Sequence, residues 1–173
     1  MKKMLLFLKL ICILLLLQSS LVSQVRSGTT AAKNKAIITK MYHYFNLNNW
    51  DSLAAIIAPD FVSHTPHPGQ KPGFEGMKEG FGEFRKAFPG VVNTPLDIVA
   101  DGDLVIVRGN VKGTQTGAMN GVPASGKTMD IEYFDEWRLR DGTVKELWGL
   151  SDVTKMMNQL GLIPAQSDSA SQK

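Results

Sequence analysis

The fold class of this chain is decided by the stretch Leu96-Asp-Ile-Val-Ala-Asp-Gly-Asp-Leu-Val-Ile-Val-Arg-Gly-Asn-Val111. Apolar residues alternate with other residues on both sides of Asp101-Gly102, which is typical of strands with one buried face. An Asp-Gly pair between two such runs is a strong signal for a hairpin turn. The stretch therefore predicts two antiparallel strands, over residues 96–100 and 104–111.

A second hairpin is predicted further along the chain. Strands over residues 128–138 and 143–152 flank the turn Asp141-Gly142, and a glycine-rich loop at 113–126 leads into them. Helices are predicted at residues 35–46, 50–58, 74–88 and 153–160. Helices that precede a four-stranded meander and pack on one face of it make an α+β domain. We therefore expect a cone-shaped, curved antiparallel sheet, with the N-terminal helices packed over it, that encloses an apolar pocket.

The N-terminus has the layout of a secretory signal peptide. A basic start with Lys2 and Lys3 precedes an almost wholly apolar run, and small residues follow up to Ser23. The run is too short to span a bilayer comfortably, so no stable membrane anchor is expected after cleavage. We expect cleavage after Ser23, with Ser20 and Ser27 as alternatives, and a secreted or periplasmic protein. The remaining chain divides into a flexible segment at 24–32, a domain at 33–164 and a disordered tail at 165–173.

The basic character of the chain belongs to this signal. The chain has 19 basic and 16 acidic residues and a pI near 9.0. Removing Lys2, Lys3 and Lys9 leaves 16 basic residues, which balance the 16 acidic ones. A nucleic-acid partner is therefore not expected. Cys12, the single cysteine, lies in the same segment, so the mature chain has no disulfide.

One acid stands out on the last strand. Alternation places Val144, Glu146, Trp148 and Asp152 on the same face, together with Leu150. A carboxylate beside apolar side chains should have a raised pKa and could serve as a general base next to a carbonyl. The alternative is that Asp152 caps the helix that follows, and the two roles are compatible.

A second inward acid is predicted on the preceding strand. Asp135 shares a face with Tyr133 and Trp137, and it becomes the better base if it lies deeper than Asp152. The alternative for Asp135 is an ion pair with a neighbouring strand.

Several linked motifs resemble the SnoaL-like polyketide cyclases, or ester cyclases, of the nuclear transport factor two and ketosteroid isomerase superfamily. The motifs occur in the order Gly113-Thr-Gln-Thr-Gly117, Gly121-Val-Pro-Ala-Ser-Gly126, Lys145-Glu-Leu-Trp148 and Gln159-Leu-Gly-Leu-Ile-Pro164. The resemblance covers about residues 33 to 164. It implies a cone with a deep apolar pocket, a homodimer and an aldol-type ring closure that needs no metal or organic cofactor.

The resemblance also implies roles for single residues. Asp152 matches the family's base, His64 matches a histidine at the pocket, and Trp148 matches a pocket-lining aromatic residue. The chain departs from the family at Gln115 and Leu147, where histidine is common. We therefore expect Gln115 to be a polar pocket position with altered chemistry.

The hypothesis for chemistry assigns the other residues as follows. His64 would hydrogen-bond the developing enolate oxygen, and Tyr133 would form pocket wall and offer a second donor. Arg108 and Asn110 share a strand face and could complete the polar set. The alternatives are a loop histidine for His64, and for Arg108 a solvated face or an ion pair with Asp135 or Glu132.

Two other motifs are not expected to be sites. Gly121 to Thr128 fits the phosphate-loop pattern, but the residues after it predict a strand where that loop needs a helix. His64 and His67 lack an obvious third ligand for a metal. The sequence thus favours proton-transfer chemistry, either cyclisation or isomerisation, on a small hydrophobic carbonyl compound. The alternative is a carrier that binds a hydrophobic ligand without catalysis.

Overall fold

The computed structural model describes residues 28–119 and 121–163 of the 173-residue chain. The predicted signal peptide and the predicted C-terminal tail lie outside the described residues. Within the described part, no helix has the length and apolar character that a membrane-spanning helix needs.

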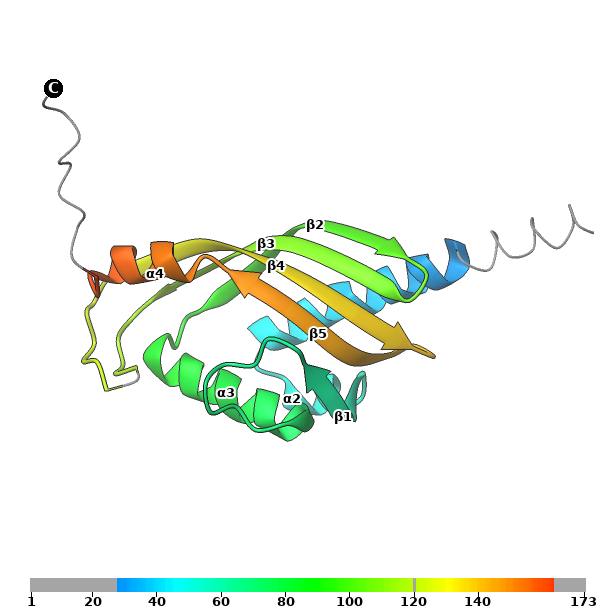
Figure 1. The fold of residues 1–173 in the computed structure, drawn as a ribbon, viewed down its shortest axis with the longest axis horizontal. Helices are drawn as coiled ribbons and strands as arrows, with labels where there is room; N and C mark the ends of the chain where they lie inside the picture. Colours follow the sequence, from blue (N-terminus) through cyan, green and yellow to red (C-terminus); the bar gives the residue numbers. More distant parts are fainter. Residues whose placement is uncertain (1–27, 120, 164–173) are drawn as a thin grey trace, which may run out of the picture.

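The fold is an α+β arrangement of a curved five-stranded sheet with helices on one side, as predicted (Figure 1). The strands lie side by side in the order β1-β5-β4-β3-β2, and β2 to β5 form the predicted antiparallel meander. The strands are β1 Ile57–Ser63, β2 Val92–Asp101, β3 Leu104–Thr114, β4 Thr128–Arg140 and β5 Thr143–Ser151.

Strand β1 takes the place of the last part of a predicted helix. The helix expected at 50–58 ends early, as α2 Trp50–Ala54, and the chain then becomes the edge strand β1. Pro59 lies inside this strand, and an edge position tolerates a proline because one side of the strand needs no ladder donors. β1 runs parallel to β5, with Ser63 opposite Leu147.

The other helices follow the prediction closely. A helix over residues 28–46 begins earlier than expected, so residues 28–32 are helical although the sequence assigned them to a flexible segment. The remaining two are α3 Gly73–Ala87 and α4 Val153–Leu160.

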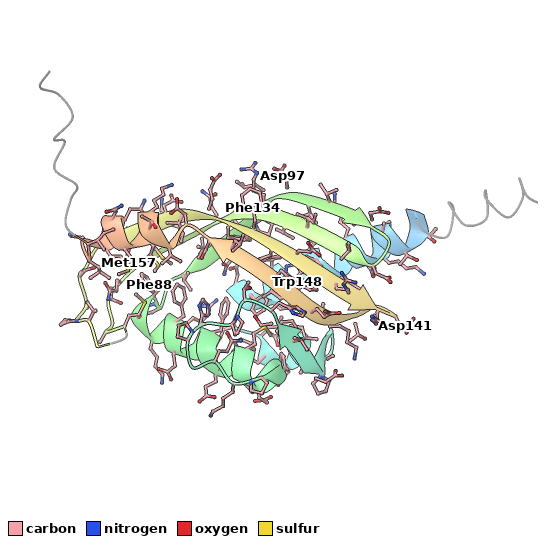
Figure 2. All side chains as sticks on the ribbon, in the orientation of Figure 1. Phe88, Asp97, Phe134, Asp141, Trp148 and Met157 are labelled. Carbon is pink, nitrogen blue, oxygen red and sulfur yellow. The ribbon has the colours of Figure 1, made fainter. Side chains whose placement is uncertain are left out.

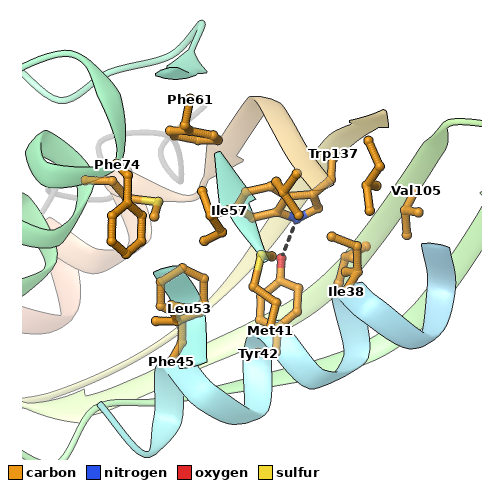
Figure 3. Close-up of a cluster of buried hydrophobic side chains, with 14 of the residues drawn as sticks. Ile38, Met41, Tyr42, Phe45, Leu53, Ile57, Phe61, Phe74, Val105 and Trp137 are labelled. Carbon is orange, nitrogen blue, oxygen red and sulfur yellow. Dashed lines mark hydrogen bonds between the residues drawn. The ribbon is translucent and has the colours of Figure 1, made fainter. Parts of the chain in front are cut away.

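The core lies between the helix over residues 28–46 and the inner face of the sheet (Figure 3). The apolar face of this helix is buried, with Ile38 and Met41 fully inaccessible to solvent. It packs against β3 and β4, whose inward side chains include Val105 and Trp137. A second, smaller cluster surrounds Phe88 and includes Met129 and Leu160. Burial of these large apolar groups is the main source of stability.

An arginine joins the helices to each other. The Arg85 guanidinium on α3 donates to the carbonyl oxygen of Phe45 at 2.5 Å and to that of Asn46 at 3.3 Å. These carbonyls end the helix over residues 28–46, where a cation is favourable. The side chain of Asn46 in turn accepts from the backbone N–H of Asn93 on β2 at 2.8 Å.

A bulge in β5 decides which of its side chains face inward. Val144 pairs with Leu139, but the next pair is Glu146 with Arg138, so Lys145 is the extra residue. One extra residue moves every later side chain to the opposite face. Leu147 therefore packs on the core, while Glu146, Trp148 and Leu150 lie on the outer face. The face predicted by simple alternation is wrong beyond Val144.

The close packing of Tyr133 on β3 predicts the cost of one substitution. In Gly109→Ala the methyl group would lie 2.4 Å from the Tyr133 hydroxyl oxygen and 2.7 Å from the carbonyl oxygen of Thr94. The backbone carbonyl cannot move aside, so we expect a loss of about 2 kcal/mol or more in a urea unfolding measurement. The matched control is Gly82→Ala on α3, where the methyl group meets no atom within 4 Å. Equal stability of the two variants would contradict this packing.

Candidate functional site

Asp152 does not lie in a dry interior. The residue is exposed and precedes α4, and its carboxylate accepts a hydrogen bond from the backbone N–H of Lys155 at 2.8 Å. The predicted shielding of this acid is therefore wrong, and the alternative interpretation as a helix cap is confirmed. The physical reason is the bulge at Lys145, which reverses the inward and outward positions that follow it, so the alternation places Asp152 on the outer face.

His64 and Trp148 form a stack on the outer side of β5. Their ring centroids are 3.9 Å apart with an interplanar angle of 6°. The His64 Nε2 atom lies 2.8 Å from a carboxylate oxygen of Glu146, and the Arg138 guanidinium lies 5.4 Å from the Trp148 ring centroid. The polar partner of His64 is thus Glu146 rather than Asp152. The structure does not bring the two predicted catalytic residues together.

Arg108 and Asn110 also lie on the outer face. Arg108 binds Asp97 at 2.7 Å and Glu132 at 3.2 Å, and Asn110 donates to Asp130 at 3.2 Å. Their neighbours Val105 and Val107 take the inward positions of β3, so alternation leaves these polar residues outside. The prediction that they line the pocket is wrong, and the predicted ion pair with Glu132 is confirmed.

Tyr133 and Gln115 are buried on the inner side. The Tyr133 ring stacks on Tyr42 with a centroid distance of 5.8 Å, and its hydroxyl has no hydrogen-bond partner among the described residues. The Gln115 amide donates to the carbonyl oxygens of Gly117 and Pro123 at 3.3 and 3.4 Å, and its side-chain oxygen is unpaired within the same part of the chain. Each residue therefore presents an unsatisfied polar atom to the interior.

Asp135 is the acid that the structure places inside. The Tyr42 hydroxyl donates to Oδ2 of Asp135 at 2.5 Å, and the Trp137 ring N–H donates to the Tyr42 hydroxyl at 3.0 Å (the latter bond is dashed in Figure 3). Because Trp137 occupies a lone pair of the hydroxyl oxygen, the single Tyr42 proton points to Asp135. The second carboxylate oxygen, Oδ1, has no hydrogen bond within the described residues.

The surroundings of Asp135 change its proton affinity. Burial raises the pKa of Asp135 to about 6, and the hydrogen bond from Tyr42 opposes the rise. Burial and the nearby Asp135 charge raise the pKa of Tyr42 well above its usual value, so Tyr42 remains a donor. An Asp in an unfolded chain titrates near 3.9, so the raised pKa of Asp135 costs about 3 kcal/mol of stability at neutral pH. Between about pH 4 and 6 the folded form keeps a proton that the unfolded chain has lost, and stability falls as the pH rises.

The sequence missed one member of this cluster. Alternation in β4 correctly placed Asp135 beside Tyr133 and Trp137, but Tyr42 received no role beyond its place in the helix predicted at 35–46. No spacing links Tyr42 to Asp135, because 93 residues separate them and only helix-on-sheet packing brings them together. The sequence signal that could have identified Tyr42 was its hydroxyl group on an otherwise apolar face of the helix.

The arrangement provides an oriented base next to aromatic side chains. One oxygen of Asp135 is held and the other is unpaired, while the raised pKa lies close to neutral. His67 is exposed in its loop, and no three His, Cys, Asp or Glu side chains within residues 28–119 and 121–163 gather as a metal site would require. With one oxygen held and a pKa raised to about 6, Asp135 is suited to accepting a proton.

Comparisons with known proteins identify the family. The model of the SnoaL-like polyketide cyclase family matches residues 35–160. Among solved structures, IdmH from Streptomyces antibioticus, a candidate polyketide cyclase, is 33% identical, with a TM-score of 0.66 over 74% of this chain and 98% of IdmH. AclR from Streptomyces galilaeus, a candidate hydroxylase, is 25% identical, with a TM-score of 0.68 over 78% of this chain and 99% of AclR.

A third structure supports the fold alone. TsrD from Streptomyces laurentii is 24% identical, with a TM-score of 0.69 over 76% of this chain and 97% of TsrD. No curated protein matches the chain. The family match spans most of the described domain, and the curved sheet with its covering helices agrees with it. The chain therefore belongs to the SnoaL-like polyketide cyclase family.

Proposed function

We propose that this protein catalyses proton transfer next to the carbonyl group of a small hydrophobic compound, as a cyclase or isomerase, with Asp135 as the base. The proposal rests on the raised pKa and the hydrogen bonding of the Asp135 carboxyl group. Its pKa is raised to about 6, its Oδ2 atom is fixed by Tyr42, and its Oδ1 atom is unpaired. A base with a pKa near the working pH combines an ionised form with useful proton affinity.

Tyr42 and Trp137 act as positioning residues in this proposal. The bond from Trp137 to Tyr42 and the bond from Tyr42 to Asp135 fix the carboxyl group relative to β4. The aromatic rings packed beside it reduce its contact with water, and a less polar environment strengthens each electrostatic interaction in the site. A carboxylate held in this way loses little free energy to reorganisation during proton transfer.

The alternative function, a carrier for a hydrophobic ligand, has its own support. The inward side chains are mostly aromatic or aliphatic, and the unpaired Tyr133 hydroxyl and Gln115 side-chain oxygen could bind a polar group of a ligand. A carrier, however, gains nothing from an ionised Asp135 that lowers stability at neutral pH. We therefore favour the catalytic function.

We further propose that two copies of the chain pair through the outer face of the sheet. Apolar side chains are exposed there on adjacent strands, with Phe134 50% and Leu150 72% accessible. Figure 2 shows Phe134 and Asp97 on the side of the sheet away from α3. Some of the charged side chains on this face are already paired, as Arg108 is with Asp97 and Glu132, which reduces the unpaired charge that a contact between two copies would bury.

We also propose that the protein is exported across a membrane. This proposal is supported by the basic start of the chain, the apolar run up to Leu17 and the small residues up to Ser23.

Deuterium exchange tests the catalytic proposal. We expect the protein to speed exchange at the α-carbon of a small hydrophobic ketone, such as 2-tetralone, in D2O followed by NMR. Asp135→Asn should lower the exchange rate about 100-fold or more, because the base is lost. Asp152→Asn should leave the rate nearly unchanged, because Asn caps a helix as well as Asp does. The rate should rise with pH through about 6, since only ionised Asp135 accepts a proton.

Two results would contradict the assignment. One is an Asp135→Asn protein that folds and exchanges as fast as the wild type. The other is a loss of exchange in Asp152→Asn with none in Asp135→Asn.

The pairing proposal predicts a change of mass in solution. The wild type should sediment as a dimer, and Phe134→Glu should sediment as a monomer, because each copy would bury an uncompensated charge at the contact. Glu75→Gln on α3, far from the outer sheet face, is the control and should remain dimeric. A dimeric Phe134→Glu protein would place the contact elsewhere.

A further inference from the structure

The carboxyl group of Asp135 lies directly against the backbone of β5. Gly149 is the residue opposite Asp135 in the pairing of β4 with β5, so the two residues share the inner face of the sheet. A Cβ atom added at Gly149 would lie 2.8 Å from Oδ1 of Asp135, which is too close for a real Cβ atom. The place that a side chain of residue 149 would need is therefore taken by the carboxyl group itself.

The type of pairing brings these two residues close together. The backbone N–H of Gly149 donates to the Thr65 hydroxyl oxygen at 2.8 Å, and the carbonyl oxygen of Leu147 accepts from the His64 N–H at 2.8 Å. These backbone groups point toward the segment that follows β1, away from β4. Asp135 and Gly149 therefore form a pair without mutual backbone hydrogen bonds, and in an antiparallel ladder the side chains of such pairs come closest.

The bulge in β5 selects this glycine. In the register that β4 and β5 have before the bulge, Trp148 would lie opposite Asp135. The extra residue, Lys145, moves β5 along by one position, so that Gly149 lies there instead. An indole ring at this position would need the space that the carboxyl group occupies. The bulge and the glycine together therefore allow the acid to lie on the inner face.

The carboxyl group is held from two sides. The Tyr42 hydroxyl donates to Oδ2, and the backbone of Gly149 lies against the side of Oδ1. The side chains of Leu147 and Thr65 lie 3.7 Å from the Cβ position of residue 149, which is an ordinary van der Waals distance. Oδ1 of Asp135 is therefore the atom that a Cβ atom would displace. As the end of a side chain it can move, but only by disturbing the bond to Tyr42.

The proton affinity of Asp135 reports where its carboxyl group lies. Burial raises the pKa of Asp135, and the bond from Tyr42 opposes the rise. Tyr133 also interacts with Asp135, and burial is the main cause that raises the pKa of both Tyr42 and Tyr133 above the usual value. Both phenols therefore stay neutral while Asp135 titrates. A displaced carboxyl group would change its contact with water and with Tyr42, and hence its midpoint of titration.

We infer that Gly149 is a positioning residue for the base; this rests on the proposed function. Its lack of a side chain lets Oδ1 of Asp135 lie against β5 while Oδ2 stays within reach of Tyr42. A larger residue would push Oδ1 away and would move the oxygen atom that takes the proton from the substrate. Because catalysis depends on the exact place of the reacting atoms, a displacement below 1 Å is enough to slow the reaction.

Gly149→Ala tests the inference, with 2-tetralone as the probe. The substitution should slow exchange about 10-fold or more, because the accepting oxygen is displaced. It should also raise the Asp135 midpoint, followed by the 13C shift of the carboxyl carbon, by about one pH unit, because the methyl group shields Oδ1 from water and weakens the Tyr42 bond. The control is Gly82→Ala on α3, where the methyl group meets no atom within 4 Å, and it should change neither quantity.

A second comparison tests the contact without a measurement of activity. Gly149→Ala is made in the wild type and in Asp135→Ala, which has no carboxyl group to displace. The change in Tm caused by Gly149→Ala should be about 3 °C or more less favourable in the wild type than in Asp135→Ala. Equal changes in the two backgrounds would show that another group limits the space at residue 149, and would overturn the inference.

The outcomes distinguish this inference from the proposed function. Exchange that is lost in Asp135→Asn, but unchanged in a folded Gly149→Ala protein with an unchanged Asp135 midpoint, would overturn the positioning role and leave the base in place. Exchange by the wild type no faster than in buffer would instead count against the proposed function itself. The Asp135 midpoint in Gly149→Ala would then still decide whether the glycine positions the carboxyl group.

Discussion

The hydrogen bond between Tyr42 and Asp135 holds the site together. It joins the helix over residues 28–46 to the inner face of β4, and it is the polar contact that allows an acid to lie in an aromatic core. Without it, the carboxylate would be partly buried and uncompensated, which is among the costlier situations in a protein interior. The Trp137 N–H orients the Tyr42 proton, so the three residues form one directed chain. The bond also leaves the second oxygen of Asp135 unpaired, and this is the feature that gives the cluster a chemical use.

The bulge at Lys145 determines which acid lies inside. It places Trp148 on the outer face and Gly149 on the inner face opposite Asp135. Had β5 continued with strict alternation, the Gly149 position would lie outside and Asp152 would be directed inward. Bulges are common near functional sites because they redirect side chains. Here the bulge gives Asp152 the role of a helix cap and leaves Asp135 as the interior acid.

The sequence predicted the fold well because local signals agreed with each other. The Asp141-Gly142 turn has positive φ angles of 49° and 75°, the conformation that an Asp-Gly hairpin turn needs, and α4 begins and ends where the pattern indicated. The site was harder to predict because it depends on contacts between distant segments. Alternation correctly placed Asp135 on the inner face of β4, but a bulge leaves no clear mark in a single sequence, and the partner Tyr42 lies 93 residues away.

The most direct test of the account is the titration of Asp135 itself, followed by the 13C chemical shift of its carboxyl carbon in the folded protein. We expect a midpoint near pH 6, and a higher midpoint in Tyr42→Phe, because the Tyr42 bond stabilises the ionised form. A midpoint near 4, the value of an exposed Asp, would show that the carboxyl group is solvated. That result would remove the physical basis for Asp135 as a base.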